Sequence, residues 1–400
     1  MYYVGLDVHQ NSTSAEILDC NGKRFKRLEL KVPWPELGPR LAREVPRPFA
    51  VCYEASCGYG YLYEQFSKVA DQVKAAHPGK LRVIFQSKHK NNRLDASKLA
   101  KVLFLDEVPA VHVPGAGVRL WRQTVEFRQK LLAEQVRAKN QVRAFLKERG
   151  FRPAAGLWTK KGTDWLKTLE LDESSALRRD LLLERLSELK QKLCRVNRQL
   201  DKTADSQPGV ALLRTIPGIG PRTAEALVAY IDDPKRFSNL RKAGAYFGWD
   251  PCQDASGPVN RLGHITRDGP ATIRKLLVEA AWTAIRHSPT IRSFYQRVVR
   301  QDPDRKKIAI VATAHHLNKV AVAMLKSGEC WRESITVAEP CGGGGEHPSR
   351  PLSLRVEDKG SPRPQAASPK RPDGTWPPTP FRFPSSLAVR DRTRRENQGD

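Results

Sequence analysis

The chain has 400 residues and a formal net charge of +26, from 69 Lys and Arg against 43 Asp and Glu. This length allows two or three domains with separate cores and excludes a peptide-scale binding module. The charge favours nucleic acid as a partner and predicts salt-dependent binding, with an anionic membrane as the weaker alternative. No stretch approaches the roughly 20 apolar residues of a membrane-spanning helix, and the N-terminus lacks a basic signal-peptide region. We therefore expect a cytoplasmic protein that does not enter a membrane.

Residues 1–112 carry the signals of an α/β domain. Runs of β-branched, aromatic or alternating residues predict strands at residues 2–8, 12–18, 24–30, 49–53 and 81–85. Asn21-Gly22 is a strong hairpin signal between the second and third of these strands. Helices are expected at residues 35–43 and 61–69. Three antiparallel strands followed by alternating helix and strand are the element order of a ribonuclease-H-like α/β domain.

Residues 113–205 contain few helix breakers and predict a helical segment. Residues 119–149 and 174–201 would each form one long helix. The second carries leucines at helical spacing, at Leu177, Leu181, Leu182, Leu186, Leu189 and Leu193. Two such helices favour an antiparallel or intermolecular coiled coil. A helical core with a solvated charged face is an equally good interpretation, because neither spacing nor charge proves dimerisation.

Residues 206–332 predict a third, mainly helical domain that opens with a glycine-containing turn. The run from Leu213 to Ala224 resembles a helix-hairpin-helix motif. In that motif Gly218 and Gly220 would let backbone N–H groups approach a phosphate, and the following helix N-terminus, with Arg222, would add positive potential. A plain turn between two helices is the alternative.

The last part of the chain, residues 333–400, is rich in Pro, Gly, Ser and Arg, with isolated aromatic residues. Such a composition cannot bury enough apolar surface to offset its ordering entropy, so we expect a disordered basic tail. An inert extension is the simpler interpretation of this tail, and weak non-specific binding of nucleic acid is the other.

Three acidic residues stand where a catalytic metal site would need them. Asp7 and Glu54 lie at the ends of strand-forming runs, and Asp95 opens a helical run. Mg²⁺ or Mn²⁺ prefers oxygen ligands, and two-metal phosphodiester cleavage holds its ions roughly 3.5–4 Å apart, so acids must converge from distant parts of the chain. Taken singly, each acid is more simply a strand-end residue facing water or a partner of the helix dipole. Because they occur together in a strongly basic chain, the metal-site interpretation becomes the better one.

Basic residues surround two of the candidate positions, Asp95 and the Ser256-Gly257 dipeptide. The residues that would contact nucleic-acid phosphates are Lys88, Lys90, Arg93, Arg261, Arg267, Arg274 and Lys275. A guanidinium or ammonium group beside an acidic site holds a phosphate well. A solvated basic face is the alternative for both sets.

Several motifs follow one another in an order that carries a family resemblance. They are Gly5-Leu6-Asp7-Val8-His9, Tyr53-Glu54-Ala55, Asn92 to Ala100, Pro217-Gly218-Ile219-Gly220, Tyr246 to Pro251, Ser256-Gly257, Gly263 to Gly269, and Arg274 to Trp282. Together they resemble the DEDD transposases of bacterial insertion sequences, the recombinases guided by a bridge RNA. The resemblance covers roughly residues 1–330. It implies a RuvC-like domain, a coiled-coil segment and a C-terminal transposase domain.

The resemblance also implies site residues. It implies an acidic tetrad that binds Mg²⁺, of which Asp7, Glu54 and Asp95 match three members. The remaining position is usually Asp and is Asn92 here, whose neutral carbonyl oxygen can still bind metal with one negative charge fewer. Ser256 matches the serine that the family uses as a nucleophile against DNA phosphodiesters. From the residues alone it is an ordinary loop serine, because a free serine hydroxyl is a weak nucleophile.

The function implied is an RNA-guided DNA recombinase that cuts and exchanges strands through a phosphoserine link. Its partners would be donor and target DNA, a non-coding guide RNA and further copies of itself in a homodimer or homotetramer, in the cytoplasm at the nucleoid. One rival is a metal-dependent nuclease similar to a Holliday-junction resolvase, in which Ser256 is structural. The second rival is a catalytically impaired nucleic-acid-binding copy, which Asn92 favours.

Two further features invite a functional interpretation. His315-His316 lacks the ligand spacing of a metal motif, so surface or capping histidines are expected. Trp249 and Trp282 would be able to stack on bases, but core aromatics are the simpler expectation.

Overall fold

The structure is a computed structural model that describes residues 1–84, 92–153, 156–256 and 259–333. At Ile84, Asn92, Arg93, Ser256 and Val259 it describes the backbone alone. These described residues belong to one compact unit. The tail expected at residues 333–400 lies outside the described residues from residue 334 onward.

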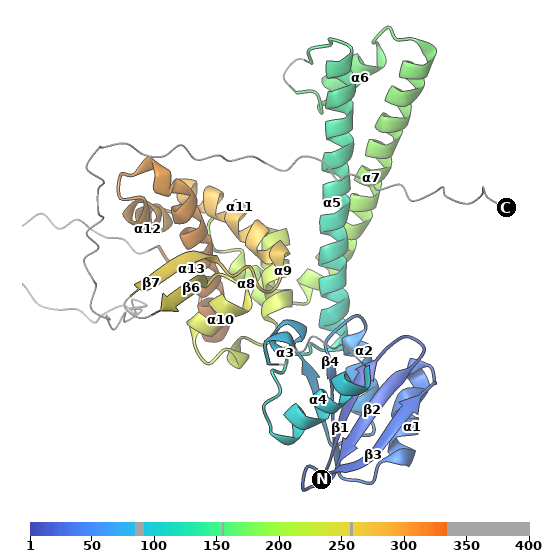
Figure 1. Ribbon diagram of the computed structural model, residues 1–400. Coiled ribbons are helices and arrows are strands. Elements are labelled where there is room, and N and C mark those ends of the chain that lie inside the picture. The colour runs from blue at the N-terminus through green and yellow to red at the C-terminus, as the bar shows by residue number, and fades with distance from the viewer. Residues whose placement is uncertain (85–91, 154–155, 257–258, 334–400) are drawn as a thin grey trace, which may run out of the picture. The chain divides into compact units, whose positions relative to one another are not determined.

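The N-terminal part contains a five-stranded mixed sheet with the strand order β3-β2-β1-β4-β5 (Figure 1). The strands are β1 Tyr2–Val8, β2 Thr13–Leu18, β3 Arg24–Leu30, β4 Phe49–Glu54 and β5 Gln72–Ala76. The first three are joined by antiparallel pairing, whereas β4 is parallel to β1 and β5 is parallel to β4. The expected α/β class is confirmed, and the first four predicted strands form as expected.

The prediction of a strand at residues 81–85 is wrong. Residues Pro78–Ile84 form helix α3, and the fifth strand lies earlier, at Gln72–Ala76; Phe85 is outside the described residues. Pro78 begins the helix, where its fixed φ is already helical and its missing N–H costs no hydrogen bond. The strand escaped prediction because Gln72 and Lys74 interrupt its apolar pattern, while its pairing with β4 supplies the missing stabilisation.

Successive residues of β1 and β4 point to opposite faces of the sheet and build two cores. Val4, Leu6 and Tyr53 belong to the core covered by helices α1 (Trp34–Glu44) and α2 (Tyr59–Phe66). Ala50 and Cys52 belong to the core on the other face, which helix α4 (Asn92–Phe104) covers. Both faces of the sheet are therefore closed by helices.

Helix α4 packs on β1 at van der Waals distance because β1 has a glycine at the crossing. A Cβ atom at Gly5 would overlap the backbone of α4, at the carbonyl oxygen of Ala96 and the amide nitrogen of Ala100. Ala96 and Ala100 are one helical turn apart and both buried. Small residues on both elements thus bring the two backbones together.

Two long helices follow and pack against each other within the chain. They are α5 (Ala116–Glu148) and α7 (Glu173–Asp205), with the short helix α6 (Lys160–Lys167) between them. Arg128 bonds to Asn197 and Arg149 bonds to Ser175, so the helices run antiparallel. Of the six leucines expected on one face of α7, Leu189 and Leu193 are buried, whereas Leu177 and Leu181 are exposed.

The remainder is mainly helical and contains one β-hairpin. Its α-helices are α8 (Pro208–Leu213), α9 (Pro221–Ile231), α10 (Leu240–Tyr246), α11 (Ala271–His287), α12 (Pro289–Val299) and α13 (Lys306–Ser327). Two short 3₁₀ helices, η1 (Pro234–Arg236) and η2 (Pro303–Arg305), lie between them. Strands β6 (Pro251–Ser256) and β7 (Val259–Ile265) pair antiparallel.

The segment formed by η2 and α13 bears on the expectation that the chain has no membrane-spanning helix. Pro303–Ser327 is long and apolar enough to cross a membrane by length and composition. In this structure 56% of its apolar window is buried inside the protein, where Leu317 and Val322 are part of the core. A core helix passes the same test of length and composition, so the feature is weak evidence for a membrane span.

The contact at Gly5 predicts a large effect of the smallest substitution. Gly5→Ala adds a methyl group against the backbone of α4, which no side-chain rotation relieves, so we expect a loss of roughly 1–3 kcal/mol in the free energy of unfolding. Urea denaturation followed by circular dichroism measures it. Gly117→Ala in the first turn of α5 is the control, because no described atom lies within 4 Å of that Cβ position. Equal stability of the two variants would contradict the packing of α4 on β1.

Candidate functional site

The register of the sheet places Asp7 and Glu54 next to each other. Leu6 of β1 pairs with Tyr53 of the parallel strand β4, so the following residues, Asp7 and Glu54, lie side by side at the carboxyl ends of the two strands. Asp7 shares a face with Gly5, and Glu54 shares that face with Cys52. Both acids therefore stand on the face that α4 covers.

Asp95 reaches the same region through the docking of α4. It lies in the first turn of α4, directly before Ala96, whose carbonyl oxygen abuts Gly5. The backbone of Asn92 begins the same helix, three residues before Asp95 and so on the same side of it, but its side chain lies outside the described residues. The fold therefore brings the three candidate acids to one face of the sheet, near the carboxyl ends of β1 and β4.

Basic side chains lie beside two of these acids. The Nζ atom of Lys98 lies 3.3 Å from Oδ1 of Asp95, and the Nε2 atom of His9 lies 3.2 Å from Oδ2 of Asp7. Among the side chains that the structure describes, no three His, Cys, Asp or Glu are gathered closely enough to hold a metal ion. The three acids offer carboxylate oxygens, which fit Mg²⁺ or Mn²⁺, but Asp7 and Asp95 would have to turn from His9 and Lys98 toward the metal.

The basic residues expected near Asp95 are only partly described. Lys88 and Lys90 lie outside the described residues, and Arg93 is described by its backbone in the first turn of α4. Their contact with phosphate stays a prediction.

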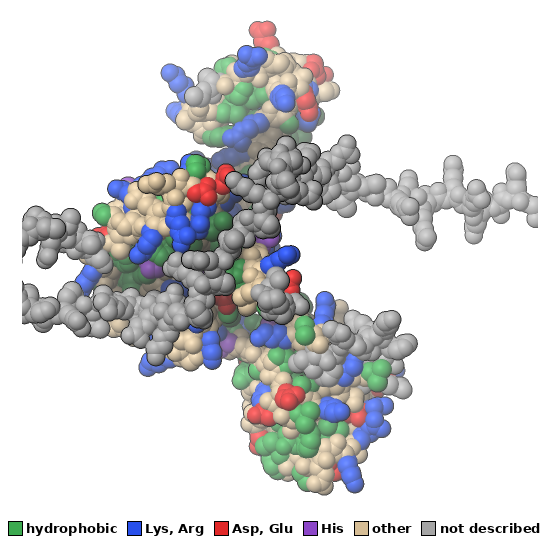
Figure 2. Space-filling view, turned by 60° about the vertical axis from the view of Figure 1, so that its left-hand side comes forward, with side chains coloured by type: hydrophobic (Ala, Val, Ile, Leu, Met, Phe, Trp, Pro, Cys, Tyr) green, Lys and Arg blue, Asp and Glu red, His purple; other side chains and the backbone are tan. Residues whose placement is uncertain are grey.

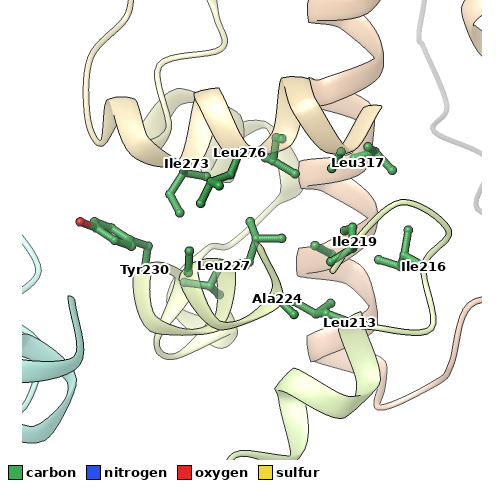
Figure 3. Close-up of a cluster of buried hydrophobic side chains, with 14 of the residues drawn as sticks. Leu213, Ile216, Ile219, Ala224, Leu227, Tyr230, Ile273, Leu276 and Leu317 are labelled. Atoms are coloured by element: carbon green, nitrogen blue, oxygen red, sulfur yellow. The ribbon is translucent and has the colours of Figure 1, made fainter. Parts of the chain in front are cut away.

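The glycine turn between α8 and α9 packs into the protein core. Gly218 has φ +88°, and a Cβ atom there would lie 2.6 Å from both the carbonyl oxygen of Ala280 and the amide nitrogen of Ala284 in α11. Ile216 and Ile219 on either side are buried, and Figure 3 shows them pointing into the cluster that contains Leu317. These contacts favour the plain interhelical turn at Gly218. At Gly220, the residue before α9, no described atom lies within 4 Å of a Cβ position.

Arg222 is engaged within the protein as well. Its guanidinium forms an ion pair with Asp201, lies 3.0 Å from a carboxylate oxygen of Glu225, and donates to the carbonyl oxygen of Asn197 in α7. Burial raises the pKa of Glu225 to about 7, although the positive charge of Arg222 opposes this. Through these contacts Arg222 connects α7 to α9. To bind a phosphate, its guanidinium would have to leave the ion pairs with Asp201 and Glu225.

Ser256 ends a strand, and the polar loop expected around it is a β-hairpin. Its backbone pairs with Val259 at the tip of the β6–β7 hairpin, while the Ser256 side chain and Gly257 lie outside the described residues. The described side chains of β6 are exposed, as are Arg261 and Arg267. An isolated two-stranded hairpin is marginally stable in water, so its base needs support.

That support comes from Arg274 of α11. Its guanidinium donates to the carbonyl oxygens of Arg267 (2.8 Å), Asp268 (2.7 Å) and Phe247 (2.9 Å), which belong to the two segments at the hairpin base. Burial lowers the pKa of this guanidinium. Backbone carbonyl oxygens already accept hydrogen bonds from both Nη atoms of Arg274, so its expected contact with phosphate stays a prediction and would have to share these donors. Lys275 next to it is exposed.

The histidine pair and one tryptophan differ from expectation. His315 stacks on Trp249 and His316 stacks on Phe294, at centroid distances of 6.2 and 4.4 Å, so both are packed, partly buried side chains rather than simple surface or capping residues. Burial lowers the pKa of both imidazoles to about 4. Trp249 is a core residue as expected, whereas Trp282 is 45% exposed.

Lys and Arg side chains outnumber Asp and Glu side chains on the face of the molecule in Figure 2. Acids at the carboxyl edge of a mixed sheet, in a chain of this charge, are typical of enzymes that cut nucleic acid with a divalent metal.

The comparisons with known proteins identify the family. Residues 4–150 match the DEDD transposase model of the IS110 type, and residues 210–296 match the model described as "Transposase IS116/IS110/IS902 family". The transposase for insertion sequence element IS1328 of Yersinia enterocolitica is 27% identical over 332 residues, 80% of this chain and 92% of that protein. The transposase for IS1111A of Coxiella burnetii is 23% identical over 282 residues, covering 68% and 74%. The chain belongs to the IS110/IS116 family of insertion-sequence transposases.

The contacts of Arg274 lead to a paired prediction. Arg274→Gln removes a charged donor from the carbonyl oxygens of four residues, the three above and Gly269. We therefore expect a loss of roughly 2–3 kcal/mol in the free energy of unfolding and faster proteolysis within residues 251–265. Lys275→Gln removes an exposed charge at the next position and is expected to leave proteolysis unchanged while weakening DNA binding. Limited proteolysis with mass spectrometry, alongside a DNA-binding titration, checks both. Unchanged cleavage of the hairpin in Arg274→Gln would refute its structural role.

Proposed function

We propose that this transposase cuts and exchanges DNA strands with two sets of groups, the carboxylates of Asp7, Glu54 and Asp95, and the hydroxyl of Ser256. The observation that carries the proposal is the placement of the carboxylates. The parallel register of β1 and β4 and the docking of α4 at Gly5 bring them to one edge and one face of the sheet. A ribonuclease-H-like assignment of this domain agrees with the strand order.

Asp7, Glu54 and Asp95, with the carbonyl oxygen of Asn92, would hold Mg²⁺ or Mn²⁺. When bound, the metal supplies positive charge that activates an attacking oxygen and stabilises the charge of the phosphodiester transition state. Lys98 and His9 lie beside Asp95 and Asp7. Both carboxylates would have to turn from these side chains to hold the metal.

Ser256 would be the nucleophile. Its Oγ atom bonds to phosphorus, the bond from phosphorus to the leaving deoxyribose oxygen breaks, and the hydroxyl proton ends on that leaving oxygen. A second DNA hydroxyl then reverses the step, which frees Ser256 and joins the strands. The position of Ser256 at the tip of an exposed hairpin, anchored by Arg274, supports access to a bulky substrate.

The partners in this proposal are donor and target DNA and a non-coding guide RNA. The net charge of +26 supports binding of polyanions, and exposed Arg261, Arg267 and Lys275 supply candidate phosphate contacts near the hairpin. We further propose a homodimer or homotetramer in which acids and serine from different copies complete one site. The cytoplasmic nucleoid would be the place of action.

Replacing the nucleophile should separate chemistry from binding. Ser256→Ala removes Oγ and leaves charge and metal ligands unchanged, so strand exchange and the covalent protein–DNA adduct should vanish while DNA affinity persists. Denaturing gels of labelled donor DNA measure the exchanged strands and the covalent protein–DNA adduct. The control is Ser238→Ala, at an exposed serine of the same part of the chain, which should keep wild-type activity. Wild-type joining by Ser256→Ala would favour hydrolysis by the acids alone, as in a resolvase-like nuclease.

The amide at position 92 predicts a change in metal dependence. Asn92→Asp adds the fourth negative charge, so it should lower the Mg²⁺ concentration at half-maximal strand exchange or restore activity to an impaired protein. A Mg²⁺ titration of cleavage measures the midpoint. Asn140→Asp adds the same charge on α5 and should leave the midpoint unchanged. An Asn92→Asp variant with an unaltered midpoint and maximal rate would place residue 92 outside the metal shell.

A further inference from the structure

The loops that follow three strands meet at the carboxyl edge of the sheet. Leu30 at the end of β3 pairs with Thr13, and Thr13 pairs with Val8 at the end of β1, so β3 and β1 end together. Trp34 begins α1 shortly after β3. Its Nε1 atom donates to the carbonyl oxygen of His9, 2.9 Å away and two residues after Asp7.

The loop after β4 receives the same tryptophan ring. Gly58, four residues after Glu54, has φ +77°, and a Cβ atom there would overlap the six-membered ring of Trp34. Trp34 therefore contacts the loops that follow both Asp7 and Glu54. Its ring lies on the α1 and α2 side of the edge, whereas the carboxylates stand on the α4 side.

A second aromatic ring lies beside Trp34 and faces solvent. Tyr61 is in the first turn of α2, with its ring centroid 6.4 Å from that of Trp34 and the ring planes at 25°. It is 37% exposed, whereas Trp34 is half-buried. The hydroxyl of buried Tyr53 donates to the carbonyl oxygen of Tyr59 at 2.6 Å and fixes the start of α2. The pair is thus held rigidly at the edge that carries the acids.

We infer that Trp34 and Tyr61 form a stacking platform for an unpaired base of the DNA strand that passes over the carboxylates. Base faces stack on aromatic rings whatever their sequence, and a strand that places a phosphate at the acids places neighbouring bases within reach of the adjacent loops. The strong positive charge of the chain favours a nucleic acid over an apolar peptide as the occupant. This inference rests on the proposed cutting site at Asp7 and Glu54.

The test is a binding measurement on the full chain without divalent metal. The probe is a partial DNA duplex with 2-aminopurine in its single-stranded overhang, whose fluorescence is quenched on stacking. Tyr61→Ala should raise the dissociation constant by roughly 5- to 150-fold and abolish the quenching. The slope of log affinity against log salt should not change, because no phosphate contact is lost. Tyr61→Phe keeps the ring and should behave as the wild type.

Phe25→Ala is the matched control. Phe25 is 48% exposed and pairs with Tyr2 at 4.9 Å, but it lies near the start of β3, at the opposite edge of the sheet. Its removal should change neither affinity nor quenching. Equal effects of Tyr61→Ala and Phe25→Ala would overturn the inference. It would also fail if Tyr61→Ala changed the slope of log affinity against log salt, or if Tyr61 mattered for an RNA overhang but not for a DNA overhang. Ser256→Ala and Asp7→Asn should retain the quenching, so a failure of the cutting mechanism is distinguishable from a failure of the platform.

Discussion

The close approach of α4 to β1 at Gly5 determines how the candidate site is assembled. Without a Cβ atom at Gly5, the backbone of the helix rests on the strand at Ala96 and Ala100. Asp95 precedes the first of these contacts, and Asp7 follows Gly5 on the same face of the strand. One backbone contact therefore sets the relation between acids from two distant segments, whereas Glu54 is positioned independently by strand register.

Much of this arrangement follows from local signals in the sequence. Alternation and the Asn21-Gly22 turn predict β1 to β3, and the acids at the strand ends predict their common edge. Strand β5 was missed because its stabilisation comes from pairing with β4, which a pattern of apolar residues does not reveal. The spacing of Gly5, Ala96 and Ala100 was available as a signal of close packing, but only the tertiary structure shows that these residues meet.

Arg222 and Arg274 show what charge alone does not reveal about an arginine. A sequence shows a cation but not the acceptors that the fold places around it. In the structure Arg274 donates hydrogen bonds to carbonyl oxygens at the base of the β6–β7 hairpin. Arg222 donates to a carbonyl oxygen of α7 and forms an ion pair with Glu225 of α9. Gly218 is another example, since the fold packs it against Ala280 and Ala284 of α11.

The same use of arginine recurs at helix ends and limits what the net charge means for DNA. Arg122 and Arg236 donate to carbonyl oxygens in the last turn of α9, and Arg292 does so in the last turn of α11. Such contacts satisfy carbonyls that have no partner within the helix and oppose the helix dipole. A guanidinium whose donors are used in this way has fewer of them left to neutralise a phosphate and so to displace counterions from DNA. The net charge of +26 therefore does not by itself count the groups that face phosphate, and exposed Lys275 and Arg261 stay candidate phosphate contacts.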